Sequence, residues 1–459
     1  MTTTPTRPQT LLARPGEPAY VEATATYNLA APLHPAAAVV ARSSADVVAA
    51  VRAAREAGLA VRSQTTGHGA GAQASLADTL LVRTAFDAPV RVDPAARTAR
   101  VPAGTTWAAV VAAAEPYGLA ALHGSSPTVG VVGYLLGGGL SFYGRRFGVA
   151  ANHVRSITVV LADGREVETS AEVEPALFWA LRGGGGGFGV VTEVEVELVE
   201  MNLVVTGGTF WDAADAAVVA PLWEAWTTTA PPEVATSLRL MNLPPLPGVP
   251  PVLVGRQVLV LDGAAQAPTV DDVERAQAVA HDLLDPLRSV ATPLLDTWHP
   301  APPSALTLTH LDPPDPMPYA GESALLRTLG AAGVAGFLEA AGPGSGTTIV
   351  AAELRQLGGA FGAPDRTGGA FDRTDAAFAY QGLGLATPET AEDLDRITTA
   401  TAPWRTGFTA PSFVEGRRQQ QRTSDDATVA RVEAVRRAVD PDGVFAGGVA
   451  PVLDRPARA

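Results

Sequence analysis

The order of apolar and polar residues predicts alternating strands and helices at the start of the chain. Residues 38–41 form a short apolar run, and in residues 44–58 the apolar positions return on one helical face until a glycine ends the pattern. Residues 59–63 form a second short strand. We expect Ser44 to cap the helix. A strand, a helix and a strand in this order favour a parallel crossover.

A second group of elements follows the same plan. Residues 98–101 are predicted to form a strand, and residues 106–117 a helix with Trp107 and three small apolar side chains on its inner face. Residues 154–161 and 166–169 predict a hairpin. Residues 190–198 alternate between apolar residues and glutamate, which is typical of a strand with one solvated face.

The chain changes character after residue 200. Proline-rich connections separate the periodic segments there, and residues 271–287 have the clearest helical spacing. Residues 347–357 and 376–385 are predicted strands, so we expect an antiparallel sheet backed by helices. Residues 423–439 form an amphipathic helix in the tail. The predicted fold class is therefore α+β.

Composition excludes several functions. The 33 basic and 47 acidic side chains give a net charge of −14, so nucleic acids and anionic membranes are poor partners. The absence of cysteine excludes disulfides, iron–sulfur clusters, thiol catalysis and cysteine-ligated zinc. Every basic residue except histidine is arginine, which excludes a lysine Schiff base and a P-loop lysine. No run reaches the ~18 apolar residues of a membrane span. Because the first residues lack a secretory signal pattern, we expect a cytoplasmic protein.

Two glycine-rich segments carry the strongest chemical signal. Residues 64–71 follow a predicted strand and place His68 among small residues, and residues 124–139 follow a comparable strand and helix. Loops of this kind turn backbone amides toward an anion, and two of them can hold both ends of a diphosphate. A solvated turn histidine is the alternative for the first loop taken alone. The nicotinamide-binding GxGxxG pattern is not found at a first strand–helix turn.

Several separate segments then form an ordered set. They are residues 44–58, 64–71, 129–139, 145–148, 181–192, 353–355 and 439–445. Together they resemble flavoproteins of the vanillyl-alcohol oxidase and p-cresol methylhydroxylase superfamily, in the branch of berberine bridge enzyme and 6-hydroxy-D-nicotine oxidase. The resemblance spans nearly the whole chain.

The resemblance implies a two-part FAD-binding domain of the p-cresol methylhydroxylase type. Residues 1–199 would form its first part and residues 412–459 its second, with a substrate domain between them at residues 200–411. The positions expected to contact FAD lie in the glycine-rich segments and in the strands beside them. They are Gln64, Thr65, Thr66, Gly67, His68, Gly69, Gly71, Ser125, Ser126, Val129, Gly130, Gly133, Tyr134, Gly138, Gly139, Asn152, Val154, Gly189 and Val191.

The resemblance also implies a covalent bond between His68 and a methyl group on the dimethylbenzene ring of the flavin. Many members with two covalent links add a cysteine in the second loop. Ser126 stands at that place here, and a serine cannot form the thioether, so we expect a single link. The alternative is non-covalent FAD with His68 as a hydrogen-bonding neighbour.

The resemblance implies that the other site residues lie in the middle sheet and beside the second glycine loop. The candidate catalytic residues are Tyr143, Glu353 and Tyr380, and the candidate substrate-binding residues are Arg355, Gln356 and Gln381. Strand alternation places Glu353 and Arg355 on one face and Gln356 on the other. A desolvated Glu353 could act as a base unless Arg355 neutralises it, and a purely structural ion pair is the alternative. No metal site is expected, since His299 and His310 lack ligand spacing.

The leading functional prediction is an FAD-dependent oxidase. It would take a hydride from a C–H bond beside an amine or hydroxyl of a medium-sized organic molecule, in secondary metabolism, and pass the electrons to dioxygen. A flavin-dependent cyclase or rearrangement catalyst without net oxidation is the second hypothesis. A non-catalytic ligand-binding protein is the third.

Overall fold

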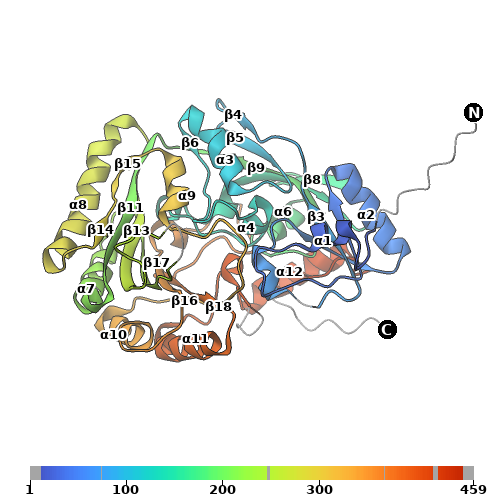
Figure 1. Ribbon diagram of the computed structural model, residues 1–459. Helices are drawn as coiled ribbons and strands as arrows, with labels where there is room; N and C mark the ends of the chain where they lie inside the picture. Colours follow the sequence, from blue (N-terminus) through green and yellow to red (C-terminus); the bar gives the residue numbers. More distant parts are fainter. Residues whose placement is uncertain (1–11, 74, 246–248, 366, 417–421, 448–459) are drawn as a thin grey trace, which may run out of the picture.

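The computed structural model describes residues 12–73, 75–245, 249–365, 367–416 and 422–447. Figure 1 shows two parts side by side: one holds the N-terminal elements and α12 (Asp426–Val439), and the other holds a large sheet with helices along its outer side. The predicted α+β class is confirmed, with mixed helices and sheets. No helix among the described residues combines the length and apolarity needed to cross a membrane.

The first sheet has three parallel strands. The order is β1 (Ala37–Ala41), β3 (Thr79–Thr84) and β2 (Ala60–Gln64), so the predicted crossover is confirmed, although β3 lies between its two strands. Helix α2 (Ser44–Glu56) packs its apolar face on this sheet. Its cap is Ser43, whose side chain accepts from the backbone of Asp46, and the prediction of Ser44 was wrong by one residue. Ser44 already has helical backbone geometry, and a cap residue must be extended.

The second sheet has five antiparallel strands. The order is β4 (Arg91–Asp93), β5 (Thr98–Pro102), β9 (Val190–Glu197), β7 (Val154–Val160) and β8 (Glu166–Ser170). The predicted hairpin is β7 and β8, and the predicted alternating strand is β9. Helices α3 (Trp107–Ala114) and α6 (Pro175–Leu181) share one apolar core with this sheet.

The middle of the chain forms the large antiparallel sheet. Its order is β14 (Leu295–Asp296), β11 (Leu203–Asp212), β13 (Gln257–Ala267), β12 (Val234–Asn242), β17 (Ala351–Gln356), β18 (Phe378–Leu385) and β16 (Tyr319–Leu326), and β15 (His299–Ala301) pairs with β11. The two predicted strands are β17 and β18, each shorter than expected. The shortening follows from the backbone, which pairs as a strand only from residue 351 and residue 378.

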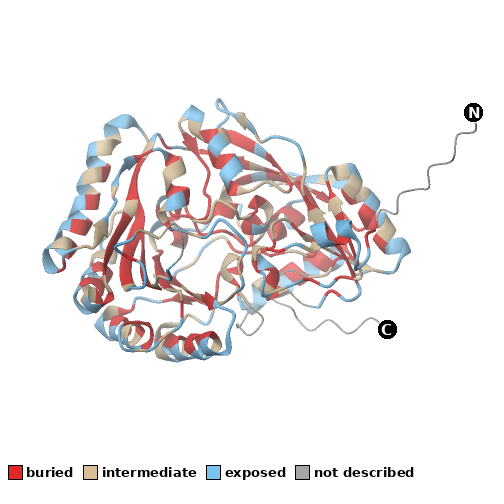
Figure 2. Ribbon diagram, viewed as in Figure 1, coloured by how far each residue is buried: buried red, intermediate tan, exposed pale blue. Residues whose placement is uncertain are grey.

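Helices cover one face of this sheet, here called the outer face. They are α7 (Ala216–Thr227), α8 (Val273–Val290), α10 (Gly330–Ala341) and α11 (Pro388–Thr401). Their sheet-facing sides are buried and their far sides exposed (Figure 2). The opposite face, here called the inner face, carries Ser237, Arg239, Glu353, Arg355 and Gln381, which pair across β12, β17 and β18.

The other short elements include α1 (Pro18–Thr24), β6 (Leu119–Ala120), α4 (Val131–Leu136), α5 (Gly144–Phe147), β10 (Val199–Glu200) and α9 (Leu306–Thr309). Of these, β6 and β10 pair as a two-stranded antiparallel sheet.

The tail packs on the N-terminal elements. Helix α12 contacts α6, and Phe445 forms a parallel bridge with Val61 of β2. The Asp440 carboxylate accepts from the backbone amides of Val444 and Phe445, which fixes the turn between helix and bridge. These are the contacts expected of a C-terminal segment that returns to the N-terminal part. The division of the chain into domains at residues 199 and 411 stays a prediction.

Candidate functional site

The two glycine-rich loops meet at His68. A Cβ atom at Gly130 would lie 3.1 Å from the Thr65 side chain, so the loops are in contact. Nε2 of His68 lies 3.2 Å from Oγ1 of Thr128, and that oxygen lies 3.0 Å from Oγ of Ser126. A hydroxyl chain therefore connects the predicted histidine with the serine of the second loop.

His68 is held on all sides. Its Nδ1 atom lies 2.7 Å from Oγ1 of Thr66, and its ring stacks on Tyr27 with the centroids 3.9 Å apart. Its backbone carbonyl accepts from the hydroxyl of Tyr319 at 2.9 Å. Burial lowers the pKa of His68 to about 4, so the ring is neutral at neutral pH. A neutral imidazole has one ring nitrogen with a lone pair, which could act as a nucleophile in place of accepting a hydrogen bond from one of these threonine hydroxyls.

The residues around these loops fit a bound dinucleotide. A Cβ atom at Gly69 or at Gly133 would meet nothing within 4 Å, so both glycines border open space. The Tyr134 hydroxyl and Oδ1 of Asn152 are buried, and each lacks a hydrogen-bond partner among the described residues. Buried polar atoms of this kind usually have a partner, and a ligand at these loops would supply it.

Other predicted FAD positions have visible packing roles. Gln64 donates to the carbonyl groups of Ala23 and Ala25, and Gly189 packs closely on β7. Six further positions predicted to contact FAD are also buried or closely packed. They are Gly71, Val129, Val154, Val191, Gly138 and Gly139. Their contact with FAD stays a prediction.

A buried network of charged side chains lies on the inner face of the large sheet. Oε1 of Glu353 accepts from Nε of Arg355 at 2.7 Å and from Oγ of Ser237 at 2.8 Å. Oε2 of Glu353 lies 3.3 Å from Nε2 of His310, and Nδ1 of His310 lies 3.1 Å from Asp262. The Glu353 side chain is only 4% exposed.

The network keeps Glu353 ionised. Burial would raise the pKa of Glu353, but the charges of Arg355 and His310 outweigh it and hold that pKa well below its usual range. Burial and Arg239 lower the pKa of His310, yet Asp262 and Glu353 raise it overall to about 9. A carboxylate stabilised in this way is a poor proton acceptor near neutral pH. Arg355 pairs with Glu353, which is the condition under which the sequence predicted a structural ion pair, and a catalytic role of Glu353 stays a prediction.

Arg355 joins the sheet to the second glycine loop. Its guanidinium lies over the rings of Phe142 and Phe413, 4.8 and 5.3 Å from their centroids. It also donates to Oγ of Ser125 at 3.2 Å, and Ser125 donates to Asp312 at 3.0 Å. Arg355 and Ser125, predicted for substrate and for FAD, therefore lie together at the junction of the two parts.

The structure places Tyr380 and Tyr143 in apolar cores, which corrects their expected place at the site, and Gln356 lies on the outer face as strand alternation predicted. Tyr380 lies in the outer-face core, with its ring 6.4 Å from that of Phe337, because it alternates with Gln381 along β18. Gln356 accepts from Thr236 on the same outer face.

Tyr143 belongs to the core of the N-terminal part, where its ring lies 5.7 Å from that of His123. Its neighbour Phe142 is the aromatic residue that faces Arg355 and His310.

A second polar group surrounds Gln381. Nε2 of Gln381 donates to Oε1 of Glu415 at 2.6 Å, and Glu415 also bonds the hydroxyl of Tyr319. Sequence reasoning missed Glu415, Tyr319 and Tyr27. No periodic pattern marks them, because each lies in or beside an irregular connection and reaches the site only through tertiary contacts.

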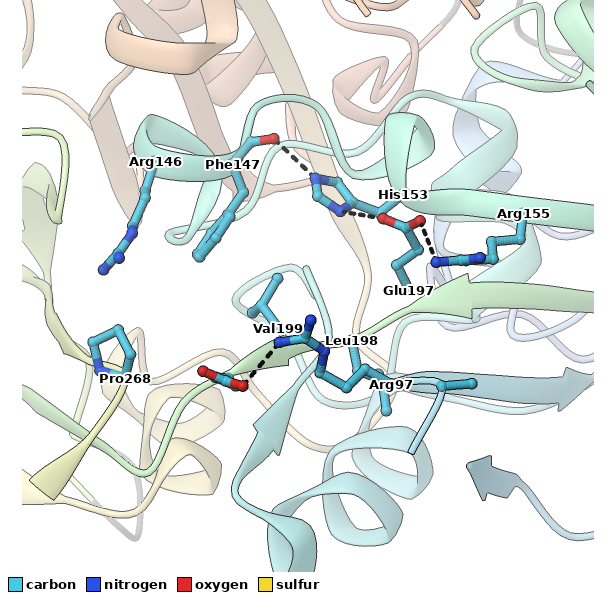
Figure 3. Close-up of a pocket in the computed structure, with 11 residues that line it drawn as sticks. Arg97, Arg146, Phe147, His153, Arg155, Glu197, Leu198, Val199 and Pro268 are labelled. Carbon is cyan, nitrogen blue, oxygen red and sulfur yellow. Dashed lines mark hydrogen bonds and ion pairs between the residues drawn. The ribbon is translucent and has the colours of Figure 1, made fainter. Parts of the chain in front are cut away.

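A surface pocket of about 330 Å³ lies elsewhere (Figure 3). Two ion pairs lie among its lining side chains: Arg97 with Glu200 at 2.8 Å, and Arg155 with Glu197 at 3.0 Å. None of the residues that line it was predicted to contact FAD or substrate.

Comparison with known proteins agrees with this geometry. Residues 35–170 match the model of an FAD binding domain. (R)-6-hydroxynicotine oxidase of Paenarthrobacter nicotinovorans is 35% identical over 166 residues, which cover 36% of this chain and 36% of that protein. Glucooligosaccharide oxidase of Sarocladium strictum is 34% identical over 182 residues, covering 39% and 36%. The chain thus matches about a third of the length of these curated relatives.

Solved structures match over nearly the whole chain. BBE-like 1 of Physcomitrella patens superposes with a TM-score of 0.80 at 20% identity, covering 97% of each chain. 6-Hydroxy-D-nicotine oxidase of Arthrobacter nicotinovorans gives 0.78 at 22% identity, covering 95% of this chain and 96% of that one. Residues 35–170 therefore match an FAD binding domain, and the whole chain shares the fold of these two solved structures.

Proposed function

We propose that this chain is an FAD-dependent oxidase with the cofactor bound covalently through His68. The observation that carries the proposal is the setting of His68: a neutral imidazole, fixed by two threonine hydroxyls and a stacked tyrosine, at the meeting point of the two glycine loops. Bound FAD would supply the two-electron chemistry, which protein side chains cannot perform.

The link would be single. One structural relative, glucooligosaccharide oxidase from Acremonium strictum, is described as having 6-S-cysteinyl, 8α-N1-histidyl FAD. Here Ser126 occupies the place where the resemblance puts the cysteine, and its hydroxyl already lies 3.0 Å from Thr128. A hydroxyl is a much weaker nucleophile than a thiolate, so only His68 is suited to bond the flavin.

The protein side chains would position the substrate and exclude water. The aromatic rings of Phe142 and Phe413 and the guanidinium of Arg355 lie together at the junction, which suits a medium-sized organic molecule. The substrate would lose a hydride from a C–H bond beside a hydroxyl or an amine, and dioxygen would take up the electrons as hydrogen peroxide. The names of the relatives support this class, since they include a hydroxynicotine oxidase and a glucooligosaccharide oxidase.

Acid precipitation tests the covalent link. We expect the purified protein to be yellow and its flavin to remain in the acid pellet, because denaturation does not break a histidyl bond. His68→Ala should release the flavin into the supernatant, whereas Ser126→Ala should leave it in the pellet. Flavin wholly in the supernatant of the wild-type protein would remove the covalent part of the proposal.

A peroxide assay tests the oxidase activity. The panel consists of (R)-6-hydroxynicotine, a glucooligosaccharide and a chitooligosaccharide, the compounds named for the relatives and one neighbouring structure. Peroxide formed with any of them supports the oxidase. Flavin reduction by none of them would count against these substrate classes.

A cyclase or rearrangement catalyst without net oxidation is the second candidate. It is favoured by the small residues Gly187 and Ser412, which lie beside predicted FAD positions. At Gly187 a side chain would meet Nε of Arg436 at 2.9 Å, and Ser412 has a buried hydroxyl without a partner among the described residues. Product formed without peroxide and without oxygen consumption would favour this candidate. A colourless purified protein would instead favour a ligand-binding role.

A further inference from the structure

We propose that Glu415, and not Glu353, is the residue that accepts the substrate proton in the oxidation. The inference rests on the proposed function and deepens it, because it names the acid–base residue of that same site.

The position of Glu415 follows from close packing on two sides. Its backbone carbonyl lies against Gly71 of the first glycine loop, where a Cβ atom would collide with it. The Cβ atom of Glu415 lies 3.0 Å from the position that a Cβ atom would take at Gly321 of β16. Glu415 therefore packs between the His68 loop and the large sheet. This is the junction where a substrate must lie to reach the flavin.

Hydrogen bonds direct the carboxyl group toward His68. Gln381 donates to Oε1 of Glu415 at 2.6 Å, and Tyr319 bonds the carboxyl group. The Tyr319 hydroxyl also lies 2.9 Å from the His68 carbonyl, and the Tyr319 ring lies 6.4 Å from that of Tyr27, which stacks on His68. Only one side chain therefore separates Glu415 from the backbone of the predicted flavin-bearing residue.

Accessibility separates the two carboxyl groups. Glu415, Gln381 and Tyr319 are all partly exposed, so a substrate hydroxyl or amine can approach them. Glu353 is buried, and its two oxygens already bind Ser237, Arg355 and His310. A base must come within ~2.6–3.2 Å of the proton's heavy atom, and the burial of Glu353 leaves a substrate little access to it.

The surroundings also give Glu415 a suitable proton affinity. Burial and the charge of Asp312 raise the pKa of Glu415 to about 7, although the bonds from Gln381 and Tyr319 oppose the rise. Among the described residues, His68, which is neutral, and Tyr27 and Tyr319, whose pKa values are raised by burial, also lie near Glu415. A base with a pKa near the working pH is the most effective.

The reaction balances with Glu415 as acceptor. The substrate C–H bond would break, and its hydride, carrying two electrons, would pass to bound FAD. The O–H or N–H bond breaks and its proton passes to the Glu415 carboxylate. The substrate becomes a carbonyl compound or an imine, and the protonated carboxyl later returns its proton to water.

Infrared difference spectroscopy of the holoprotein tests the titration without any substrate. Between about pH 5 and about pH 9, we expect the band of a protonated carboxyl group to disappear with a midpoint near 7. Glu415→Gln should abolish this titration, Glu353→Gln should keep it, and Tyr319→Phe should shift its midpoint. A titration that persists in Glu415→Gln would overturn the proposal.

Anaerobic flavin reduction tests the chemistry with the panel compound that reduces the wild-type flavin fastest. The rate should rise with pH through about 7, and Glu415→Gln should lose this rise and slow reduction by ~10²–10⁴-fold. Glu415→Asp should restore part of the rate, and Glu353→Gln should keep the pH dependence. An unchanged pH profile in Glu415→Gln would refute the role. If no panel compound reduces the wild-type flavin, the substrate proposal fails, and the infrared result still decides whether Glu415 titrates.

Discussion

Glu353 and Glu415 show how neighbouring side chains decide what a carboxyl group can do. Both lie at the junction of the two parts, and burial raises the proton affinity of each. Glu353 faces an arginine and a charged histidine, which reverse the effect, whereas Glu415 faces an amide, a phenol and the like charge of Asp312. The nature of the partner, and not the depth of burial alone, therefore sets the charge state.

His310 should make the stability of the protein depend on pH. Its pKa is about 9 in the folded protein, above the ordinary value of about 6.5, so its ion pairs with Asp262 and Glu353 stabilise the fold fully below about pH 6.5. This stabilisation is lost as the pH rises through 9. Urea unfolding should show a free energy of unfolding that falls between about pH 7 and about pH 10. His310→Gln should flatten this fall, and the exposed His281→Gln should not. Equal slopes in both variants would contradict the prediction.

Local chemistry sets the ends of elements and the path of the loops. Helix α2 begins after Ser43 because that residue is extended and its hydroxyl accepts from the first turn. The first glycine loop turns at Gly67, whose φ of 77° is in the left-handed region and whose missing side chain leaves room for Thr26. These positions specify the loop that carries His68.

Ser43 and Ser44 provide a matched pair for the helix cap. Ser43→Ala should lower the free energy of unfolding by about 1 kcal/mol, because it removes the hydrogen bond to the Asp46 amide. Ser44→Ala should change it by less than about 0.5 kcal/mol. Chemical denaturation followed by circular dichroism measures both. A larger loss in Ser44→Ala would show that the cap is at the predicted and not the observed residue.

Gly67 and Gly69 flank His68 and should differ in their tolerance of a side chain. Gly67→Ala should destabilise the protein by about 1–3 kcal/mol, because its Cβ would lie 2.8 Å from the Thr26 backbone at a positive φ. Gly69→Ala has open space and a φ of −84°, so the fold should keep its stability. Thermal unfolding compares the two. The flavin content of Gly69→Ala is a separate readout, and a drop in flavin without a loss of stability would support a cofactor at that open space.

At the scale of the whole molecule, the tail completes the first part of the chain. Phe445 is 2% exposed and packs with Val61 and Leu80 beneath the strand that leads to His68. Residues at the two ends of the chain thus build one core. Such an arrangement supports the proposal of a two-part FAD domain.

Removing the Phe445 side chain tests that proposal. Phe445→Ala should lower the free energy of unfolding by about 3–5 kcal/mol, since it leaves a cavity in a buried cluster. The matched control is Leu385→Ala, whose side chain is exposed and which should cost less than about 1 kcal/mol. Flavin retention should fall with stability in Phe445→Ala. Equal effects of the two variants would show that the tail is not part of this core.

The sequence by itself determined most of the fold and one end of the site. Regular spacing of apolar residues predicted α2, the β7–β8 hairpin, β9, β17 and β18, because a local pattern of burial is enough to specify a helix or a strand. The ordered motifs indicated the FAD-binding domain, and the glycine loop placed His68 between small residues. Alternation along a strand also predicted that Glu353 and Arg355 share a face while Gln356 does not.

Only the tertiary structure decided which polar groups meet at the junction. His310 and Asp312 lie in a proline-rich connection, Tyr27 and Glu415 lie near opposite ends of the chain, and no periodicity marks any of them. Their pKa values depend on partners that are distant in sequence, as with Arg355 beside Glu353 and Asp312 near Glu415. Electrostatic interactions act through space and vary steeply with distance and burial, so the order of residues along the chain does not contain them until the fold brings the charges together.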